Sequence, residues 1–383
     1  MKILMLLESN FPPDTRVENE INVLLERGHE VHMACVKTKR DSQEKKFGKT
    51  IIHRMGLNEL ARKSSVAALS FPLYFQVWRK FVQQLMDSHH FDAIHVHDLQ
   101  LARIGYEMKK RYGVQFVLDL HENWPALLKI SEHTKSFLGS FLFSEKQWKN
   151  YERKYVRLAD KVIVVVEEAK ERIQSLGVAP DKIYVVSNTQ NLEEFNFEIP
   201  AKEHDKVVFT YAGGITFHRG LQYVLKAAAQ LDALDFEIRI VGAGRFLDKL
   251  QELAKALSIE QKVHFLGWQN RDALLKIVFE SDVALIPHIK SAHTDSTIPH
   301  KLFQYLYAEK PILASNCCPI ERILKETGGG WTYSFDDVNE LAMIMQQIIQ
   351  KEYQLKDFAN GKEAVLTKYN WNVDKANLLE VYQ

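Results

Sequence analysis

Short apolar runs rich in β-branched residues alternate with amphipathic helical patterns from one end of the chain to the other. In the first half such runs cover residues 2–7, 29–36, 50–55, 93–97, 114–121, 161–166 and 182–187. The alternation restarts after residue 206, with runs at 207–214, 236–244, 262–267, 283–288, 310–315 and 328–334. Apolar strands separated by helices indicate parallel sheets that are covered on both faces. We therefore expect an α/β protein with two doubly wound domains, whose ligands dock at the carboxyl ends of the strands.

A polar, irregular stretch interrupts this alternation near the middle of the chain. Residues 191–205 show neither strand nor helix periodicity, and 383 residues are too many for one ordinary hydrophobic core. We therefore expect a first Rossmann-like domain over residues 1–190, a linker over 191–205 and a second such domain over 206–369. Residues 370–383 carry an aromatic-rich helical pattern, which we expect to pack back on the first domain.

The composition is that of a soluble globular protein and narrows the classes of partner. Hydrophobic residues make up 46% and charged residues 26% of the chain, and a formal net charge of +1 gives no global field that would attract nucleic acid. Three cysteines are too few for a disulfide framework, which favours a reducing cytosol. The apolar run at the N-terminus is short, and no apolar run reaches 18 residues, so we expect a cytoplasmic protein.

The first apolar run leads into ESNFPPDTRVENE, where two prolines form a rigid turn and Asp14 or Thr15 can cap the next helix. Arg16 then stands in the first helical turn, where a cation is unfavourable unless it serves a ligand or a local partner. Two explanations stay open at this point. Arg16 contacts a ligand, or it pairs with Glu20 four residues later.

Histidine and acidic side chains gather at the ends of two neighbouring strands of the first half. The motifs are HVHDLQLA and LDLHENWPAL, and the residues concerned are His97, Asp98, Asp119, His121 and Glu122. Because ligands dock at the carboxyl edge of such a sheet, we expect these side chains to line a substrate cleft, and we expect His95 to be a satisfied sheet residue. The sequence has no HExxH or comparable spacing, which disfavours a metal site.

Three motifs of the second half could hold an anion. In YAGGITFHRG, Gly213 and Gly214 follow a strand, and Arg219 offers a forked donor for phosphate oxygens. The VGAGR turn contains Gly242, which either approaches a ligand or only permits a tight turn. In STIPHKLFQYLYAEKPILAS, a helix expected to begin at Pro299 would present free N–H groups to a phosphate.

Taken together in this order and spacing, these motifs are similar to those of the family-four retaining glycosyltransferases of the GT-B fold. The resemblance extends over nearly the whole chain. It is carried by FPPDTRVENEINVLLERGHEV, by HVHD followed by DLHE, by VVSNTQNLEEF, by YAGGITFHRGL with IVGAG and VHFLGW, and by STIPHKLFQYLYAEKPILAS.

The resemblance implies two domains that face each other across a cleft, with a role in polysaccharide biosynthesis. The second domain would bind a nucleoside diphosphate sugar, UDP- or GDP-linked, and the first a glycan or lipid-linked acceptor, without metal or cofactor. Arg219 would contact the diphosphate and His97 the transferred sugar, both as catalytic residues. The residues assigned to the donor are Gly213, Gly214, Gly242, Ser296, Thr297, Ile298, His300 and Gln304, and those assigned to the acceptor cleft are Arg16, Asp98, Asp119, His121 and Glu122.

The chain departs from the family pattern at several of these positions. Ser296 and Gln304 stand where members commonly have two glutamates, Gly214 stands where an arginine is common, and Arg219 replaces a lysine. A glutamine keeps one carbonyl acceptor for a ribose hydroxyl but loses the charge, which should weaken nucleotide binding by about 1 kcal/mol. Two alternatives to an active transferase stay open: a catalytically degenerate partner subunit that binds sugar nucleotides, and a sugar-nucleotide 2-epimerase.

Two segments, residues 60–85 and 135–155, mix aromatic residues with lysine and arginine. They could lie against an anionic membrane and reach a lipid-linked acceptor, which would make the protein peripheral at the inner face of a membrane. The alternative is that they are ordinary amphipathic helices packed on the first domain.

Overall fold

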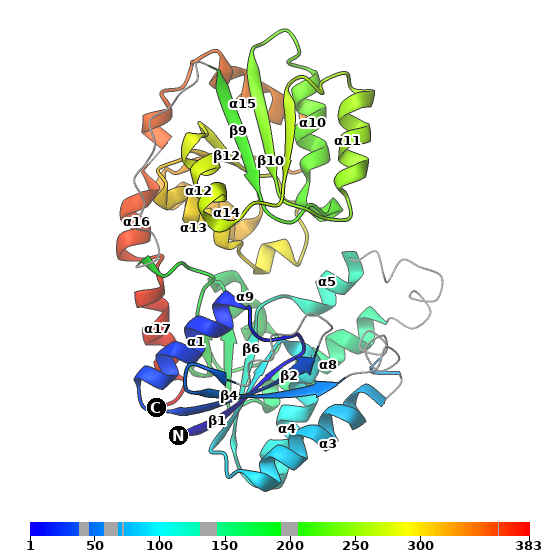
Figure 1. Ribbon diagram of the computed structural model, residues 1–383, viewed down its shortest axis with the longest axis vertical. Helices are drawn as coiled ribbons and strands as arrows, with labels where there is room; N and C mark the ends of the chain where they lie inside the picture. The colour runs from blue at the N-terminus through cyan, green and yellow to red at the C-terminus, as the bar shows by residue number, and fades with distance from the viewer. Residues whose placement is uncertain (38–45, 57–67, 71–72, 131–143, 193–205, 359) are drawn as a thin grey trace. The chain divides into compact units, whose positions relative to one another are not determined.

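The computed structural model describes residues 1–37, 46–56, 68–70, 73–130, 144–192, 206–358 and 360–383 (Figure 1). The chain divides into two compact units. The first contains Met1–Ser187 together with Asp374–Gln383, and the second contains Asn188–Val373. Most of the expected linker, residues 193–205, lies outside the described residues.

The first unit is built on an eight-stranded sheet with the order β3-β4-β2-β1-β5-β6-β7-β8. All neighbouring strands pair in parallel except β3 and β4, which are antiparallel. In chain order the strands are β1 Lys2–Leu7, β2 Glu30–Lys37, β3 Lys46–Phe47, β4 Thr50–Gly56, β5 Ala93–His97, β6 Gln115–Leu120, β7 Lys161–Val164 and β8 Ile183–Val185. The seven strands expected from the sequence are all present, and the two-residue β3 is the one further strand among the described residues of this unit.

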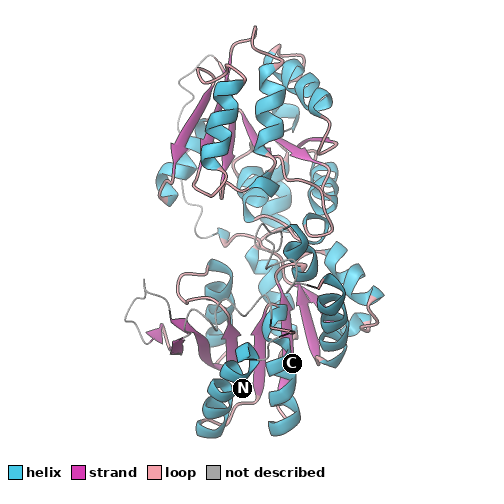
Figure 2. Cartoon of the chain, turned by 90° about the vertical axis from the view of Figure 1, so that its right-hand side faces the viewer, coloured by secondary structure: helices cyan, strands magenta, loops and turns pink. Residues whose placement is uncertain are grey.

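Helices cover both faces of this sheet (Figure 2). On one face α3 and α8 both pack on α4, and α9 is tied to α8 by the Arg172–Glu152 ion pair. The α1 helix lies on the other face, where its Glu20 approaches His95 of β5. The bounds are α1 Thr15–Glu26, α3 Leu73–Ser88, α4 Ala102–Tyr112, α5 Trp124–Ile130, α8 Glu145–Leu158 and α9 Glu167–Ser175.

The last helix, α17 (Trp371–Glu380), continues into the first unit as its C-terminal segment. The hydroxyl of Tyr382 lies 2.5 Å from Nδ1 of His95, and Gln115 donates to the backbone oxygen of Val381 at 3.1 Å. Asn377 also donates to the backbone oxygen of Val185 at 2.9 Å. The end of the chain is therefore held on β5, β6 and β8 by named hydrogen bonds.

The second unit has a six-stranded, fully parallel sheet with the order β11-β10-β9-β12-β13-β14. Its strands are β9 Val207–Ala212, β10 Phe236–Val241, β11 Val263–Gly267, β12 Val283–Ile286, β13 Ile312–Ser315 and β14 Gly330–Tyr333. The six expected strands are confirmed, although several are shorter than the apolar runs. For example, β9 ends at Ala212 because Gly213 already belongs to the following turn.

Helices complete the second unit on both faces of its sheet. One apolar core joins the strands to α10, α11 and α15 through residues such as Leu225, Leu250 and Met345. The helices are α10 Leu221–Ala229, α11 Leu247–Ala256, α12 Arg271–Glu280, α13 His300–Tyr307, α14 Cys318–Thr327, α15 Val338–Ile349 and α16 Gly361–Thr367. The expected start of α13 is displaced by one residue, because Pro299 is its N-cap in an extended conformation.

The two segments considered for membrane contact coincide in part with α3 and α8. Their described aromatic residues turn inward: Tyr74, Phe75, Trp78, Trp148, Tyr151 and Tyr155 are all buried. Residues 60–67, 71–72 and 135–143 of these segments lie outside the described residues. Packing on the first domain is therefore what the described helices show. Within the described residues, no helix is long and apolar enough to span a bilayer.

Candidate functional site

Two glycine turns of the second unit lie directly against each other. The N–H of Gly213 donates to Val241 at 2.9 Å, and the N–H of Ile215 donates to Ala243 at 2.9 Å. A Cβ on Gly242 would lie 1.9 Å from the backbone oxygen of Gly213, so no side chain fits there. Gly242 also has a φ of +138°, which L residues rarely adopt. The structure therefore gives Gly242 a backbone-packing role, whereas its contact with a ligand remains a prediction.

Gly214 differs from the other glycines of this site. It is exposed, and a Cβ built on it would meet no atom within 4 Å. Its backbone is also outside the left-handed region, because no positive φ is recorded for it. The position where family members carry an arginine is therefore open enough to hold one.

Arg219 is positioned by a short turn and by a neutral histidine. It ends the 3-10 helix Phe217–Arg219, and the next residue, Gly220, has a φ of +74°. A Cβ on Gly220 would lie 1.7 Å from the backbone oxygen of Pro287, so glycine is required for this approach. Nη1 of Arg219 lies 2.9 Å from Nε2 of His288. Burial, followed by the charge of Arg219, holds the pKa of His288 well below its usual value, so this imidazole accepts and orients the guanidinium.

Lys301 is a further cation of this site that the sequence motifs did not single out. Its Nζ is buried and has no hydrogen-bond partner among the described residues. It lies 3.7 Å from the centre of the Tyr211 ring and 3.2 Å from the position of a Cβ on Gly213. Burial, and then the charge of Arg219, lower the pKa of Lys301 well below its usual value. Lys301 therefore lies beside the first glycine turn and close enough to Arg219 for the two basic groups to affect each other.

The loop before α13 places its expected site residues in two different environments. The hydroxyl of Ser296 donates to Ala292 at 2.8 Å, so it closes its own 3-10 turn. Thr297 is half-buried, and the backbone oxygen of Ile298 accepts from Asn188 at 3.0 Å. His300 is the first residue of α13, where the helix begins beside Lys301.

Gln190 joins two of the expected site residues of α13. Its Nε2 lies 3.4 Å from Nδ1 of His300, and its Oε1 accepts from Gln304 at 3.5 Å. Gln190 is itself fixed at its backbone, because its oxygen accepts from Trp371 at 3.0 Å. Gln304 therefore has an amide partner on the protein, which the sequence did not predict because Gln190 is more than one hundred residues away.

The expected cleft residues of the first unit form one charged cluster at the ends of β5 and β6. Arg16 lies at its centre and is only 6% exposed. Its guanidinium donates to Asp119 at 3.1 Å and to the backbone oxygen of Val186 at 2.8 Å, and its Nε lies 3.2 Å from Glu20. The pairing with Glu20 is thus confirmed, although it is buried and not on the surface. The cap of α1 is Asp14, which accepts from Val17.

His121 is the most exposed imidazole of this cluster, whereas His97 is fully buried. His121 is 16% exposed at its side chain and donates to Asp119 at 2.9 Å. Burial opposes its charged form, but Asp119 and Asp98 outweigh burial and raise the pKa of His121 to about 9. His97 is fully buried, and its pKa is lowered to about 3 by burial and by His95. A charged His121 therefore lies in front of a neutral His97, whose Nε2 has no hydrogen-bond partner among the described residues.

His95 is a buried sheet residue, as the sequence predicted, and one of its two ring nitrogens has a hydrogen bond. It is fully buried, with Nδ1 on the Tyr382 hydroxyl and Nε2 3.6 Å from Asp119. Glu20, His95, His97 and Asp119 offer ligand atoms within 4.8 Å of one another. The guanidinium of Arg16 already lies 3.1 Å from Asp119 and 3.2 Å from Glu20, so both carboxyl groups have a partner on the protein. The remaining expected cleft residues, Asp98 and Glu122, are half-buried, and Asp98 lies 3.9 Å from His121.

Comparison with known proteins extends these observations. Residues 14–194 match the sequence model described as Glycosyltransferase Family 4, and residues 193–364 match the one described as Glycosyl transferases group 1. An uncharacterized glycosyltransferase of Methanocaldococcus jannaschii is 24% identical over 345 residues, which cover 83% of each chain.

Solved structures share the fold over the full length. Sucrose-phosphate synthase from Thermosynechococcus elongatus superimposes with a TM-score of 0.80 at 15% identity, covering 100% of this chain and 98% of that one. HepE of Anabaena in complex with UDP-glucose superimposes with a TM-score of 0.68 at 15% identity, covering 100% and 99%. The same assignment follows from the two adjoining family matches, from the relatives and from the two doubly wound units. The chain is a glycosyltransferase that belongs to the group 1 and family 4 glycosyltransferases of the GT-B fold.

Proposed function

We propose that the second unit binds a nucleoside diphosphate sugar and that the chain transfers the sugar, with retention of configuration, to a glycan or lipid-linked acceptor. The observation that carries this proposal is the buried amino group of Lys301, which lies beside the first glycine turn and has no hydrogen-bond partner within the part of the chain that the structure describes. A buried charge is costly unless it is paired, so a site that retains one is suited to an anionic ligand.

The diphosphate would meet three electropositive groups. Lys301 and Arg219 supply two cationic side chains, and α13 supplies the N–H groups of its first turn, which starts at His300. Such groups stabilise the negative charge that develops on the diphosphate as its bond to the anomeric carbon breaks. Because these groups provide the charge stabilisation, we expect turnover not to require added Mg²⁺ or Mn²⁺.

The donor is proposed to carry uridine or guanosine. The HepE structure contains UDP-glucose, which supports a uridine nucleotide for a chain of this fold. On the acceptor side, His97 is the proposed contact of the transferred sugar. Its neutral imidazole has an unpartnered Nε2, and with its Nδ1 turned toward Asp119 at 3.3 Å that Nε2 can accept from a sugar hydroxyl. His121 lies closer to solvent, so an incoming acceptor would contact it before His97.

A second function is favoured by Ser296 and Gln304, which stand where family members commonly have glutamates. The hydroxyl of Ser296 is turned to its own loop, and the amide of Gln304 faces Gln190, so neither supplies the carboxylate that family members have. A chain altered in this way could bind a sugar nucleotide without turning it over and act as a partner subunit.

One assay separates the two functions. The purified chain is incubated with a panel of UDP, GDP and ADP sugars and with candidate glycan or lipid-linked acceptors, and nucleoside diphosphate release is followed alongside calorimetric binding. Release above that of a Lys301→Met variant supports the transferase. Binding of a sugar nucleotide with no release under any acceptor condition would contradict transfer and support the partner subunit.

A further inference from the structure

Three histidines of the first unit lie together away from the charged cluster already described. His32 is on β2, His53 is on β4, and His89 follows directly after α3. Along β1, His32 is aligned with Leu4, whereas His95 is aligned with the next residue, Met5. Successive residues of a strand point to opposite faces, so His32 and His95 lie on opposite faces of the sheet. The three histidines therefore form a separate site.

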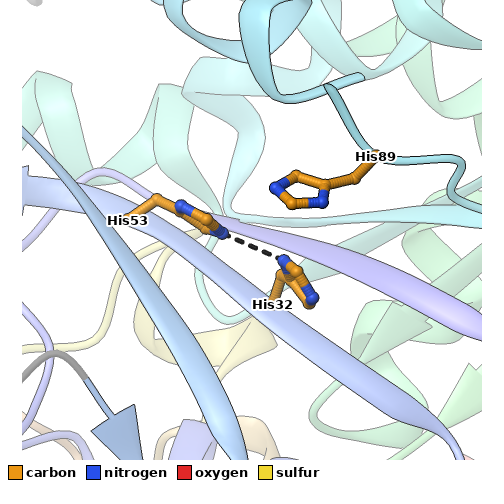
Figure 3. A group of neighbouring side chains, drawn as sticks. All are labelled: His32, His53 and His89. Atoms are coloured by element: carbon orange, nitrogen blue, oxygen red, sulfur yellow. Dashed lines mark hydrogen bonds between the residues drawn. The ribbon is translucent and has the colours of Figure 1, made fainter. Parts of the chain in front are cut away.

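The three imidazoles converge on one another (Figure 3). Nδ1 of His32 lies 2.9 Å from Nε2 of His53. The ring centres of His32 and His89 are 5.0 Å apart, and those of His53 and His89 are 5.7 Å apart. One ring nitrogen from each residue lies within 4.8 Å of the others. Three nitrogen ligands at this spacing can reach a single small ion.

A carboxylate fixes the orientation of the most buried ring. Nε2 of His32 lies 3.0 Å from Glu30, and Glu30 is held in turn by Lys2 at 2.8 Å. The Nε2–H of His32 is therefore donated to Glu30, and its Nδ1 presents a lone pair toward His53. A histidine that binds a metal through one nitrogen commonly donates the other N–H to a carboxylate.

The surroundings keep these rings in the state that binds metal. Burial lowers the pKa of His32, and the hydrogen bond to Glu30 offsets this only in part. Burial is also the main cause that lowers the pKa of His53 to about 4, and the neighbouring His32 adds to it. Only a neutral imidazole has a free lone pair for a metal. Edge-on packing of Phe91 against His32, with ring centres 5.1 Å apart, excludes water from one side of the group.

We propose that His32, His53 and His89 bind one divalent transition-metal ion of the zinc class. Imidazole nitrogens suit Zn²⁺, and three protein nitrogens with one water complete a tetrahedron. Nitrogens at 2.0–2.1 Å from a tetrahedral ion are about 3.3 Å apart, so the 2.9 Å contact of His32 and His53 opens by only a few tenths of an ångström. When the ion replaces the hydrogen bond between His32 and His53, the proton of His53 moves from Nε2 to Nδ1, which leaves Nε2 free to bind the ion.

The ion would join three parts of the first unit that are distant in sequence. It links β2, β4 and the end of α3, all of which belong to the first unit. The expected effect is stabilisation of the native state, because an ion that binds only the folded chain raises its free energy of unfolding. This inference does not depend on the proposed transferase activity.

The proposal is tested by titrating a divalent metal into protein that carries no affinity tag and has been treated with a chelator. The wild-type chain is compared with the ligand variant His89→Asn and the control variant His90→Asn. The adjacent His90 is exposed and supplies a matched control with the same substitution. We expect the wild-type chain and His90→Asn to bind one equivalent of Zn²⁺ or Co²⁺, with a melting temperature that rises on binding. We expect His89→Asn to bind at least tenfold more weakly and to show a smaller rise.

The spectrum of bound Co²⁺ keeps the test decisive if His89→Asn is less stable. An intense visible band reports a four-coordinate ion in the wild-type chain, and His53→Asn provides a second ligand variant. Absence of stoichiometric binding by the wild-type chain would overturn the proposal. Equal affinity of the wild-type chain, His89→Asn and His90→Asn would overturn it as well, because the ion would then lie elsewhere.

Discussion

The ammonium of Lys301 lies over the ring of Tyr211, 3.7 Å from its centre, and neither an acceptor nor an anion accompanies it among the described residues. A cation over a desolvated aromatic ring gains about 2 kcal/mol. Loss of hydration costs a buried ammonium several kcal/mol, so the ring alone does not compensate for it. Burial, and then the charge of Arg219, therefore hold the pKa of Lys301 well below its usual value in the free protein, at the place where a diphosphate is proposed to bind.

Replacing Lys301 by methionine should stabilise the free protein. The variant keeps the apolar stem and removes the buried charge, so we expect the free energy of unfolding to stay equal or to rise by about 1–2 kcal/mol. Denaturant unfolding without ligand measures this change. Lys226→Met is the control, since Lys226 also lies over a tyrosine ring, Tyr223, but is exposed. A large loss of stability specific to Lys301→Met would show that the ammonium has a structural partner.

Arginine at position 214 should strengthen nucleotide binding. The site has room for the side chain, and the added guanidinium would join Arg219 and Lys301 beside the first glycine turn. A charge-assisted contact to phosphate is worth about 1.5–3 kcal/mol, and partial exposure reduces it, so we expect Gly214→Arg to lower the Kd of a nucleoside diphosphate about three- to tenfold. Gly214→Glu has the opposite charge and should raise the Kd. If Gly214→Arg weakened binding as much as Gly214→Glu, position 214 would not face the phosphates.

Glutamate at position 304 should leave nucleotide affinity unchanged or increase it. The carboxylate would accept a ribose hydroxyl more strongly than the amide does, by about 1 kcal/mol. Gln190, which accepts from Gln304 at 3.5 Å, has an amide that can turn its N–H₂ toward the new carboxylate. Calorimetric titration of Gln304→Glu with nucleoside diphosphates checks this. A marked loss of affinity, with unfolding unchanged, would show that α13 does not present this position to the ribose.

The stability of the first unit should fall as the pH rises from 7 to 9.5. The folded pKa of His121 is about 9 against 6.5 when unfolded, and that of Glu20 is about 8 against 4.5, with burial as its main cause. The folded chain therefore holds more protons in this window, and their stabilisation is lost as the pH rises through these folded values. For His121 the loss is about 2 kcal/mol across the window.

Denaturant unfolding at several pH values measures this loss, with His121→Gln as the comparison. Glutamine retains a donor for Asp119 but does not titrate, so the variant should lose less stability between pH 7 and 9.5 than the wild-type chain. The lowered pKa of His97 changes the free energy of unfolding only below pH 6.5, and so does not contribute between pH 7 and 9.5. Identical pH profiles for the two proteins would contradict a charged His121 in the folded state.

The strands could be predicted closely because parallel strands covered by helices are continuous apolar runs. All thirteen expected strands form, and the boundaries move mainly where a glycine such as Gly213 or Gly242 begins a turn. The two-residue β3 carries no such run, which is why it was missed. Asp14 as a cap followed from a local rule, and the burial of His95 followed from its place in an apolar strand.

The side-chain partners of the sites could not be predicted, because they come from distant parts of the sequence. Tyr382 meets His95 across 287 positions, and Gln190 meets Gln304 across 114. Lys301 was passed over because a lysine in the first turn of an amphipathic helix is ordinary, and only the structure shows its Nζ to be buried. The grouping of His32, His53 and His89 likewise depends on strand register and on where α3 ends.

The most direct test of the donor site compares a nucleoside diphosphate with its nucleoside in the wild-type chain and in Lys301→Met. Calorimetry measures the affinity for UDP and for uridine, and likewise for GDP and guanosine and for ADP and adenosine. The difference within each pair is the contribution of the diphosphate to binding. We predict that Lys301→Met lowers the affinity for the preferred diphosphate at least tenfold and leaves the affinity for its nucleoside unchanged. An equal effect on both ligands, or no effect on either, would contradict a diphosphate held by Lys301.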